Sequence, residues 1–478
     1  MCATSLLETV RENYLLIMIR GFLLSILLLP FSITAISQPK FDVKFSEPLA
    51  VFIFVQNLSS HVGDNPFKSV FTASAYNQVK YKTFIAQFDS LTLSYAYEFP
   101  AYPTGSKMPG MTDRLLKKNL IDCNSLQDFK IRSLGLIPYK DLLALSTILE
   151  VFTPVYRELI YTPNAAKFKG QLRNLSNYVV SKNIPSYFKM ALRFYGSSWD
   201  DSIPFEMVLY PLPNARGFTA EAFINDAVSA VPTNEKEYNG LLSIMLHEVF
   251  HMIYNEQPLK MKQDISNWFM TNSSQCSNYA YWLMNEAFAT VLGNGYVYAK
   301  LSGKVDTGAW YNQPYINAMA KKIYPLASEY ITSQKTIDQD FVNRYIALYA
   351  HSYSDWLNDL GNILTYRYVL TDDSKDYDMI RNAYPYTSYA DEDGPITAAA
   401  IEKMRYTPTT KVIIVSENHQ ADLEMLKNAF PELSNWQYTA DTEFTYHVFL
   451  NDKTQLIIIN RFSALTVDLL NRTFAHSL

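Results

Sequence analysis

The chain has 478 residues, of which 48% are hydrophobic, 18% charged and 14% aromatic. This length and composition indicate a globular protein of two or three domains and exclude an intrinsically disordered chain. With 41 basic and 46 acidic residues the formal net charge is −5, which argues against nucleic acid as a partner.

Residues 1–37 are predicted to be an N-terminal extension followed by an export signal peptide. Arg20 precedes an uncharged apolar run at 21–36, and residues 35–37 offer small side chains at the positions that a signal peptidase reads. The run is short for a membrane span and is interrupted by Pro30, and no later stretch is long and apolar enough to cross a bilayer. We therefore expect an exported protein (periplasmic, cell-surface or secreted) with no stable membrane span after signal removal.

The region 38–198 is predicted to be mainly helical, after a short strand at 41–45. Ser46, followed by a proline two residues later, is typical of a helix start, and the helix is expected to run to about Leu58. Further helices are predicted at 75–91, 139–159, 165–182 and 187–194. The sequence leaves three roles open for this region: an inhibitory prodomain, a substrate-gripping domain or a part of the catalytic fold.

Residues 199–370 are predicted to form the core of a zincin-like domain. Two strand candidates, 204–212 and 224–231, lead into an apolar helix at 241–255, which indicates a small sheet packed on that helix. We expect 224–231 to be either an edge strand lying along a cleft, where it could pair with an extended peptide, or an ordinary core strand.

The apolar helix carries the motif His247-Glu248-Val249-Phe250-His251. Positions i and i+4 lie on one face of a helix, so the two imidazoles can bind one metal ion. Glu248 is rotated by roughly 100° and lies beside the open position of such a metal, where it can act as the base for a zinc-bound water. The alternative is a pair of core histidines that donate to backbone carbonyls.

A second helix is predicted at 279–292, and Glu286 is its only acidic residue. Its neighbours in sequence include Trp282 and Phe288, and a carboxylate in such apolar surroundings needs a cation or hydrogen bonds. We interpret Glu286 as a third metal ligand, which completes the set of three protein ligands and one water found at catalytic zinc sites. A buried ion pair or an exposed helix face is the alternative.

The motif HEVFH followed by the segment 285–289 (NEAFA) resembles the gluzincin zinc peptidases, a class that includes the thermolysin-like and aminopeptidase families. The pair of motifs is also similar to that of uncharacterised exported bacterial proteins. The resemblance covers 50–70 residues around the site, and it implies Zn²⁺ bound by His247, His251 and Glu286, with Glu248 as general base. Thr290 stands where thermolysin-like enzymes have an Asp, and the separation between the two motifs is longer than is usual.

The same resemblance implies a His or Tyr that stabilises the oxyanion. The helix predicted at 338–360 carries three candidates, Tyr349, His351 and Tyr353, for each of which a surface or core role is the alternative.

The remaining chain is predicted to comprise a linker or cleft-rim loop at 371–400 and a small α/β domain at 401–478. Strands are expected at 411–416, 446–450 and 455–460, and helices at 420–430 and 464–470. The fold class is therefore α+β, mostly helical, with a small sheet on the motif helix and a C-terminal α/β domain.

These observations predict an exported zinc-dependent peptidase that acts on a peptide or protein substrate. Two alternatives remain: a zinc-stabilised binding protein without turnover, and a metal-dependent hydrolase of a non-peptide bond. The sequence indicates neither the oligomeric state, nor whether Cys123 and Cys276 pair, nor whether cleavage is internal or terminal.

Overall fold

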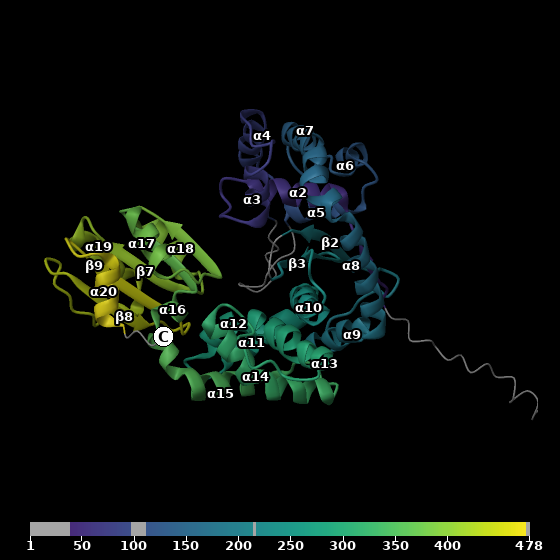
Figure 1. Ribbon diagram of the computed structural model, residues 1–478. Coiled ribbons are helices and arrows are strands. Elements are labelled where there is room, and N and C mark those ends of the chain that lie inside the picture. Colours follow the sequence, from purple (N-terminus) through teal and green to yellow (C-terminus); the bar gives the residue numbers. More distant parts are fainter. Residues whose placement is uncertain (1–38, 97–110, 214–216, 475–478) are drawn as a thin grey trace, which may run out of the picture. The chain divides into compact units, whose positions relative to one another are not determined.

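Helices dominate the fold, with 58% helix against 13% strand in two mixed sheets, which confirms the predicted α+β class (Figure 1). The computed structural model describes residues 39–96, 111–213 and 217–474, so the predicted export signal at 1–37 lies outside the described residues. None of the helices within these ranges combines the length and hydropathy that crossing a bilayer requires. Residues 40–478 form one structural unit.

The first described elements are β1 (Phe41–Lys44) and α2 (Glu47–Leu58), as predicted. Ser46 caps α2, because its Oγ accepts a hydrogen bond from the Leu49 backbone N–H at 3.3 Å. The other elements of the N-terminal region are α3 (Pro66–Thr72), α4 (Val79–Asp89), α5 (Thr112–Asp122), α6 (Leu126–Arg132), α7 (Tyr139–Tyr156), a π-helical turn η1 (Arg157–Tyr161), α8 (Thr162–Ser181) and α9 (Ile184–Tyr195). Three of these, α3, α5 and α6, are additions to the predicted helices.

The first sheet has the strand order β1-β2-β4-β3, with β2 (Phe205–Leu212), β3 (Ala220–Phe223) and β4 (Asp226–Pro232). The interpretation of 224–231 as an edge strand is wrong, because β4 lies between its parallel neighbour β2 and its antiparallel neighbour β3. The edge strands are β1 and β3, and the sequence patterns did not predict β3. A tight turn at Ile224 (φ 55°) joins β3 to β4, and a branched residue in that left-handed conformation is a rare turn signal.

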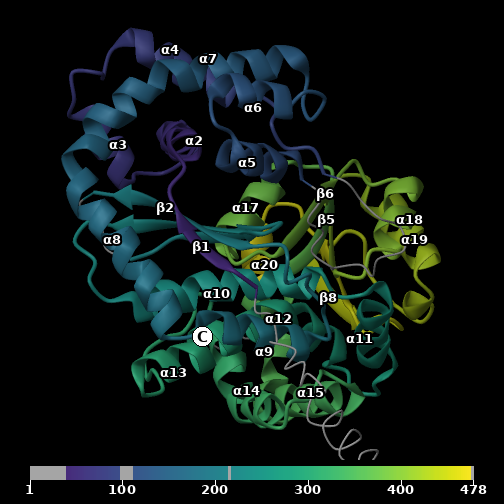
Figure 2. The ribbon, with the colours of Figure 1, turned by 90° about the vertical axis from the view of Figure 1, so that its right-hand side faces the viewer.

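Both faces of this sheet are buried. Val208 and Tyr210 of β2 pack against the N-terminal helices, whereas Met207 and Leu209 face the core that contains α10 (Tyr238–Asn255). Figures 1 and 2 show the same layering, with the strands between α2 and α10. Burial on both faces explains why the strands read as nearly continuous apolar runs. The predicted packing of a small sheet on the motif helix is confirmed by the contacts of β3 and β4 with α10.

Helices follow one another after α10. They are α11 (Leu259–Thr271), α12 (Ser277–Thr290), a π-helical segment η2 (Val291–Val297), α13 (Tyr298–Ser302), α14 (Pro314–Thr332), α15 (Gln339–Tyr353), a 3₁₀ turn η3 (Ser354–Asn358) and α16 (Leu360–Ile363). Within this group α12 and η2 both pack against α10, so the two predicted motifs lie on neighbouring helices.

A second sheet of order β6-β5-β7-β9-β8 builds the C-terminal region. Its elements are β5 (Tyr366–Thr371), α17 (Lys375–Ala383), β6 (Tyr389–Asp393), α18 (Ala398–Arg405), β7 (Thr410–Val415), α19 (His419–Ala429), a 3₁₀ turn η4 (Pro431–Leu433), β8 (Phe444–Phe449), β9 (Gln455–Asn460) and α20 (Thr466–Thr473). The segment 371–400 is therefore no linker, since it contains α17 and the edge strand β6. The sequence YADED of β6 is polar because this edge strand is largely exposed.

The C-terminal sheet is joined to the motif helices by a shared core. Val412 and Ile414 of β7 belong to the same buried cluster as α10 and α12, whereas Ile413 and Val415 face α18 and α19. The Tyr279 hydroxyl of α12 lies 3.2 Å from the Thr410 hydroxyl at the start of β7.

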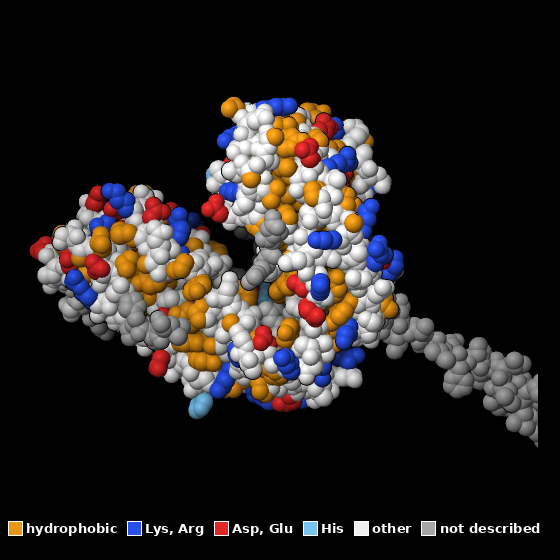
Figure 3. Space-filling model, viewed as in Figure 1, with side chains coloured by type: hydrophobic (Ala, Val, Ile, Leu, Met, Phe, Trp, Pro, Cys, Tyr) orange, Lys and Arg blue, Asp and Glu red, His pale blue; other side chains and the backbone are white. Residues whose placement is uncertain are grey.

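On the face drawn in Figure 3, basic and acidic side chains of the described residues are interspersed. Cys123 and Cys276 are both free thiols.

Candidate metal centre

The helix α10 holds His247 and His251 one turn apart inside the core. Leu246 and Phe250, which flank these histidines, are fully buried, and the two imidazoles are themselves almost inaccessible. A helix that is apolar nearly all round can only be stable when it is covered on every side. The sheet, α9, α12 and η2 provide that cover, so the fold fixes the position and direction of both histidines.

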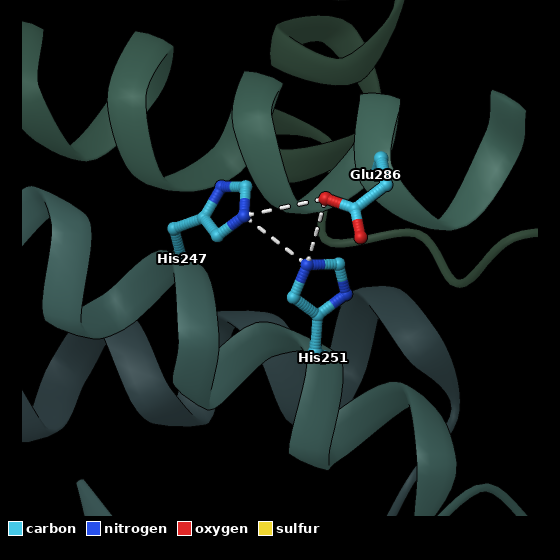
Figure 4. Close-up of side chains that lie close together, drawn as sticks. All are labelled: His247, His251 and Glu286. Atoms are coloured by element: carbon cyan, nitrogen blue, oxygen red, sulfur yellow. Dashed lines mark hydrogen bonds and ion pairs between the residues drawn. The ribbon is translucent and has the colours of Figure 1, made fainter. Parts of the chain in front are cut away.

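Three donor atoms from α10 and α12 converge at one point (Figure 4). The Nε2 atoms of His247 and His251 lie 3.1 Å apart, and Oε2 of Glu286 lies 3.1 Å from Nε2 of His251 and 3.6 Å from Nε2 of His247. Among the described residues, these three form the one group of His, Cys, Asp and Glu side chains close enough to share a metal ion.

These separations match the donor set of a tetrahedral zinc site. Zinc binds His nitrogen and carboxylate oxygen at about 2.0–2.2 Å, which places neighbouring ligand atoms roughly 3.3 Å apart in a tetrahedron. The three measured separations span 3.1 to 3.6 Å. A neutral His247 that carries its proton on Nε2 can hydrogen-bond to the Glu286 carboxylate, and with Nε2 deprotonated the three donor atoms are of the types that zinc binds.

Asn285 sets the proton position on His251. Its Oδ1 lies 2.7 Å from Nδ1 of His251, and because an amide oxygen can only accept, Nδ1 must carry the proton. Nε2 of His251 then presents its lone pair to the shared point. Burial lowers the pKa of His247, which favours the neutral imidazole that a metal ligand requires.

Glu248 is more accessible than Glu286, the carboxylate that converges with the two histidines. Its side chain is 30% exposed, compared with 16% for Glu286 and 5% for His247. Its Oε1 lies 3.8 Å from Nε2 of His247, too far for a hydrogen bond but beside the point where the donors converge. This position suits a group that exchanges protons with a substrate or a water molecule rather than a metal ligand.

The π-helical segment η2 passes unusually close to α10. A methyl group at Gly293 would lie 2.8 Å from both Cα and Cβ of His247, closer than real contacts allow. Glycine at this position therefore permits the approach, and π-helical turns are frequent at functional sites.

Nδ1 of His247 and Oγ1 of Thr290 are buried without a hydrogen-bond partner among the described protein atoms. Thr290, which stands at the position of the Asp in thermolysin-like enzymes, therefore does not hydrogen-bond to His247.

We expect the substitution Gly293→Ala to disturb the metal centre. The added methyl group must push η2 away from His247, which should lower the free energy of unfolding by about 1–3 kcal/mol and weaken Zn²⁺ binding. Denaturant unfolding and zinc titration measure the two effects. Gly170→Ala in α8 is the matched control, because its methyl group meets open space and should be neutral or stabilise by about 0.5–1 kcal/mol. Unchanged zinc affinity in Gly293→Ala would show that the close approach does not position His247.

The three residues expected from the sequence to stabilise an oxyanion make their contacts elsewhere. Tyr349 is fully buried and its hydroxyl accepts from the Asn362 amide at 2.9 Å. The Tyr353 hydroxyl donates to the Ala318 carbonyl at 3.2 Å, and His351 is exposed on α15. These contacts assign Tyr349 and Tyr353 to the packing of α14 to α16, which is a structural role.

Tyr311 borders the candidate metal centre, and sequence reasoning missed it. Its ring stacks on His247 with centroids 5.7 Å apart and planes 20° apart. Burial, together with the charge of Glu286 and hydrogen bonding to it, raises the pKa of Tyr311 well above its ordinary value. A phenol held neutral in this way keeps its proton available for donation. Tyr311 lies in the irregular segment before α14, where no periodic pattern marks it.

Comparison with protein-family models, with curated proteins and with solved structures found no match to the chain. The arrangement of side chains therefore has to support any functional proposal by itself.

Proposed function

We propose that the protein is an exported zinc-dependent peptidase, with His247, His251 and Glu286 as the metal ligands. The observation that supports this most directly is the convergence of two imidazole nitrogens and one carboxylate oxygen next to a more accessible carboxylate. Structural zinc sites use all four positions for protein ligands, whereas catalytic sites leave one open. Three protein ligands and a neighbouring base correspond to the catalytic type.

When bound, Zn²⁺ would supply Lewis acidity that polarises a scissile carbonyl and acidifies a water molecule. Glu248 would take a proton from the attacking water and deliver it to the nitrogen of the leaving amine. Asn285 would hold His251 in the required tautomer throughout. With Glu286 engaged as a metal ligand, the Tyr311 hydroxyl would turn from Glu286 and donate its hydrogen bond to the substrate oxygen as negative charge develops on that oxygen.

The role of Tyr311 leads to a prediction. Replacing it with Phe keeps the ring that stacks on His247 but removes the hydroxyl group. We expect kcat to fall by about 10²–10³-fold, the usual effect of losing one oxyanion donor, with zinc content unchanged. The same substitution at Tyr353, whose hydroxyl is bound to a backbone carbonyl, is the control and should leave kcat within about threefold.

The proposed function itself is tested with the zinc-loaded chain and a diverse peptide library. We expect one zinc ion per chain, peptide cleavage, and loss of cleavage on chelation that returns with added zinc. Zinc binding without any cleavage would instead favour a zinc-stabilised binding protein. Turnover of ester or glycosidic substrates, with none of peptides, would favour a hydrolase of a non-peptide bond.

A further inference from the structure

A pocket of about 380 Å³ has the proposed metal ligand Glu286 in its lining. This volume falls within the roughly 300–1,000 Å³ that is typical of ligand sites. One part of the lining comes from α12 and from the segment before α14, which contributes Tyr311. The other part comes from the C-terminal region and consists of Thr365, Tyr366 and residues 385–388, which we call the wall segment. Two regions that are distant in sequence therefore meet beside the metal centre.

Hydrogen bonds hold both ends of the wall segment against the start of β5. At one end, Nη1 of Arg367 donates to the Tyr384 carbonyl at 3.0 Å and to the Leu364 carbonyl at 3.1 Å. At the other end, the Ser388 backbone N–H donates to the Thr365 carbonyl at 2.8 Å. The wall segment is therefore attached to the backbone that leads into β5.

Arg367 shows that the interior of the C-terminal region fixes this attachment. The side chain is only 1% exposed, and burial lowers the pKa of its guanidinium. A buried charge costs free energy that hydrogen bonds have to offset. The two carbonyls that Nη1 binds lie directly before Thr365 and directly before the wall segment, so the bonds that satisfy Arg367 also position both pieces of the pocket lining.

The wall segment brings an accessible aromatic ring to the pocket. Tyr386 is 42% exposed and lines the pocket together with Pro385 and, from α14, Ile316. Burial and the nearby charge of Glu286 raise the pKa of Tyr366, a further lining residue, to about 12, so this phenol is neutral. Uncharged rings and aliphatic groups are covered most favourably by another apolar group. The lining near the wall segment thus suits a large apolar side chain.

We propose that the wall segment selects the substrate residue that binds next to the metal centre, with Tyr386 as the specificity-determining side chain for a large apolar residue such as Phe or Leu. The selected residue lies close to the scissile bond because Glu286 lines the same pocket. This inference rests on the proposed function and gives the C-terminal α/β region a part in substrate selection.

The test measures peptide binding in the zinc-loaded Glu248→Gln chain, which is expected not to cleave. The probes are a fluorescent peptide with one central Phe and the same peptide with Ala in place of Phe. We expect Tyr386→Ala to raise Kd for the Phe peptide about tenfold, the scale of losing an apolar contact in a hydrophobic pocket. Kd for the Ala peptide should stay within about twofold, because the peptide already lacks the group that Tyr386 contacts.

Tyr406→Ala is the matched control. Tyr406 is a 76% exposed tyrosine of the same region that does not line this pocket, so its loss should leave both Kd values within about twofold. Equal weakening of both peptides by Tyr386→Ala, an unchanged Kd for the Phe peptide, or no binding of either peptide would overturn the inference. Failure of the proposed function has a different signature: the zinc-loaded wild-type chain would bind the Phe peptide in a Tyr386-dependent manner, yet would leave it intact.

Discussion

Replacing Glu248 with Gln is expected to abolish peptide cleavage while the chain still binds one zinc ion. The amide cannot accept a proton from water, whereas a positioned general base contributes about 10²–10⁴-fold to a rate. We expect kcat to fall by at least about 10³-fold. Because Glu248 is not among the three converging donors, the zinc affinity should change by less than about threefold.

Glu237→Gln provides the control for this experiment. Glu237 is an exposed acid at the N-terminal cap of the same helix, so its neutralisation changes the charge of α10 at a distance from the metal. Its kcat should equal that of the wild type. Cleavage by Glu248→Gln at the wild-type rate would remove the proposed base and require another acceptor for the proton.

The donor set could be predicted from the sequence because it depends on local geometry. The spacing of His247 and His251 places them on one face wherever the segment is helical. The proximity of Glu286 to the histidines was predicted because a lone carboxylate in an apolar helix needs a partner. The apolar runs of β7 and β9 were equally local signals, and both strands form as expected.

The sequence patterns did not predict residues and strands whose position depends on contacts between distant segments. Tyr311 reaches His247 only because the segment between α13 and α14 passes over the metal centre, and no helical or strand period marks such a segment. The strand β3 was missed because its turn uses Ile224 in the left-handed region. The edge strand β6 is polar enough to resemble a loop. In each case the packing of distant segments decides the conformation.

Replacing Glu286 with Ala should have opposite effects on stability with and without zinc. In the wild type, zinc held by the three proposed ligands should stabilise the folded state by about 4 kcal/mol at a free concentration one thousand times Kd. Removing one of three protein ligands should weaken binding at least about 10²-fold, so most of this stabilisation is lost. Without zinc, the substitution removes a partly buried carboxylate 3.1 Å from an imidazole nitrogen, and the variant should be at least as stable as the wild type.

The sign of the stability change in metal-free Glu286→Ala distinguishes a Glu286 that binds a metal from a Glu286 that forms a structural ion pair. If Glu286 instead paired with a protonated histidine, its loss would destabilise the metal-free chain, because a buried charge without its partner is costly. Thermal unfolding of both chains, with a chelator and with added zinc, distinguishes the two cases. Glu329→Ala is the control for loss of a carboxylate: its ion pair with Arg344 at 2.6 Å is exposed, so the change in stability should be small and independent of zinc. Destabilisation of metal-free Glu286→Ala, with no zinc-dependent gain in the wild type, would assign the three side chains to packing rather than to catalysis.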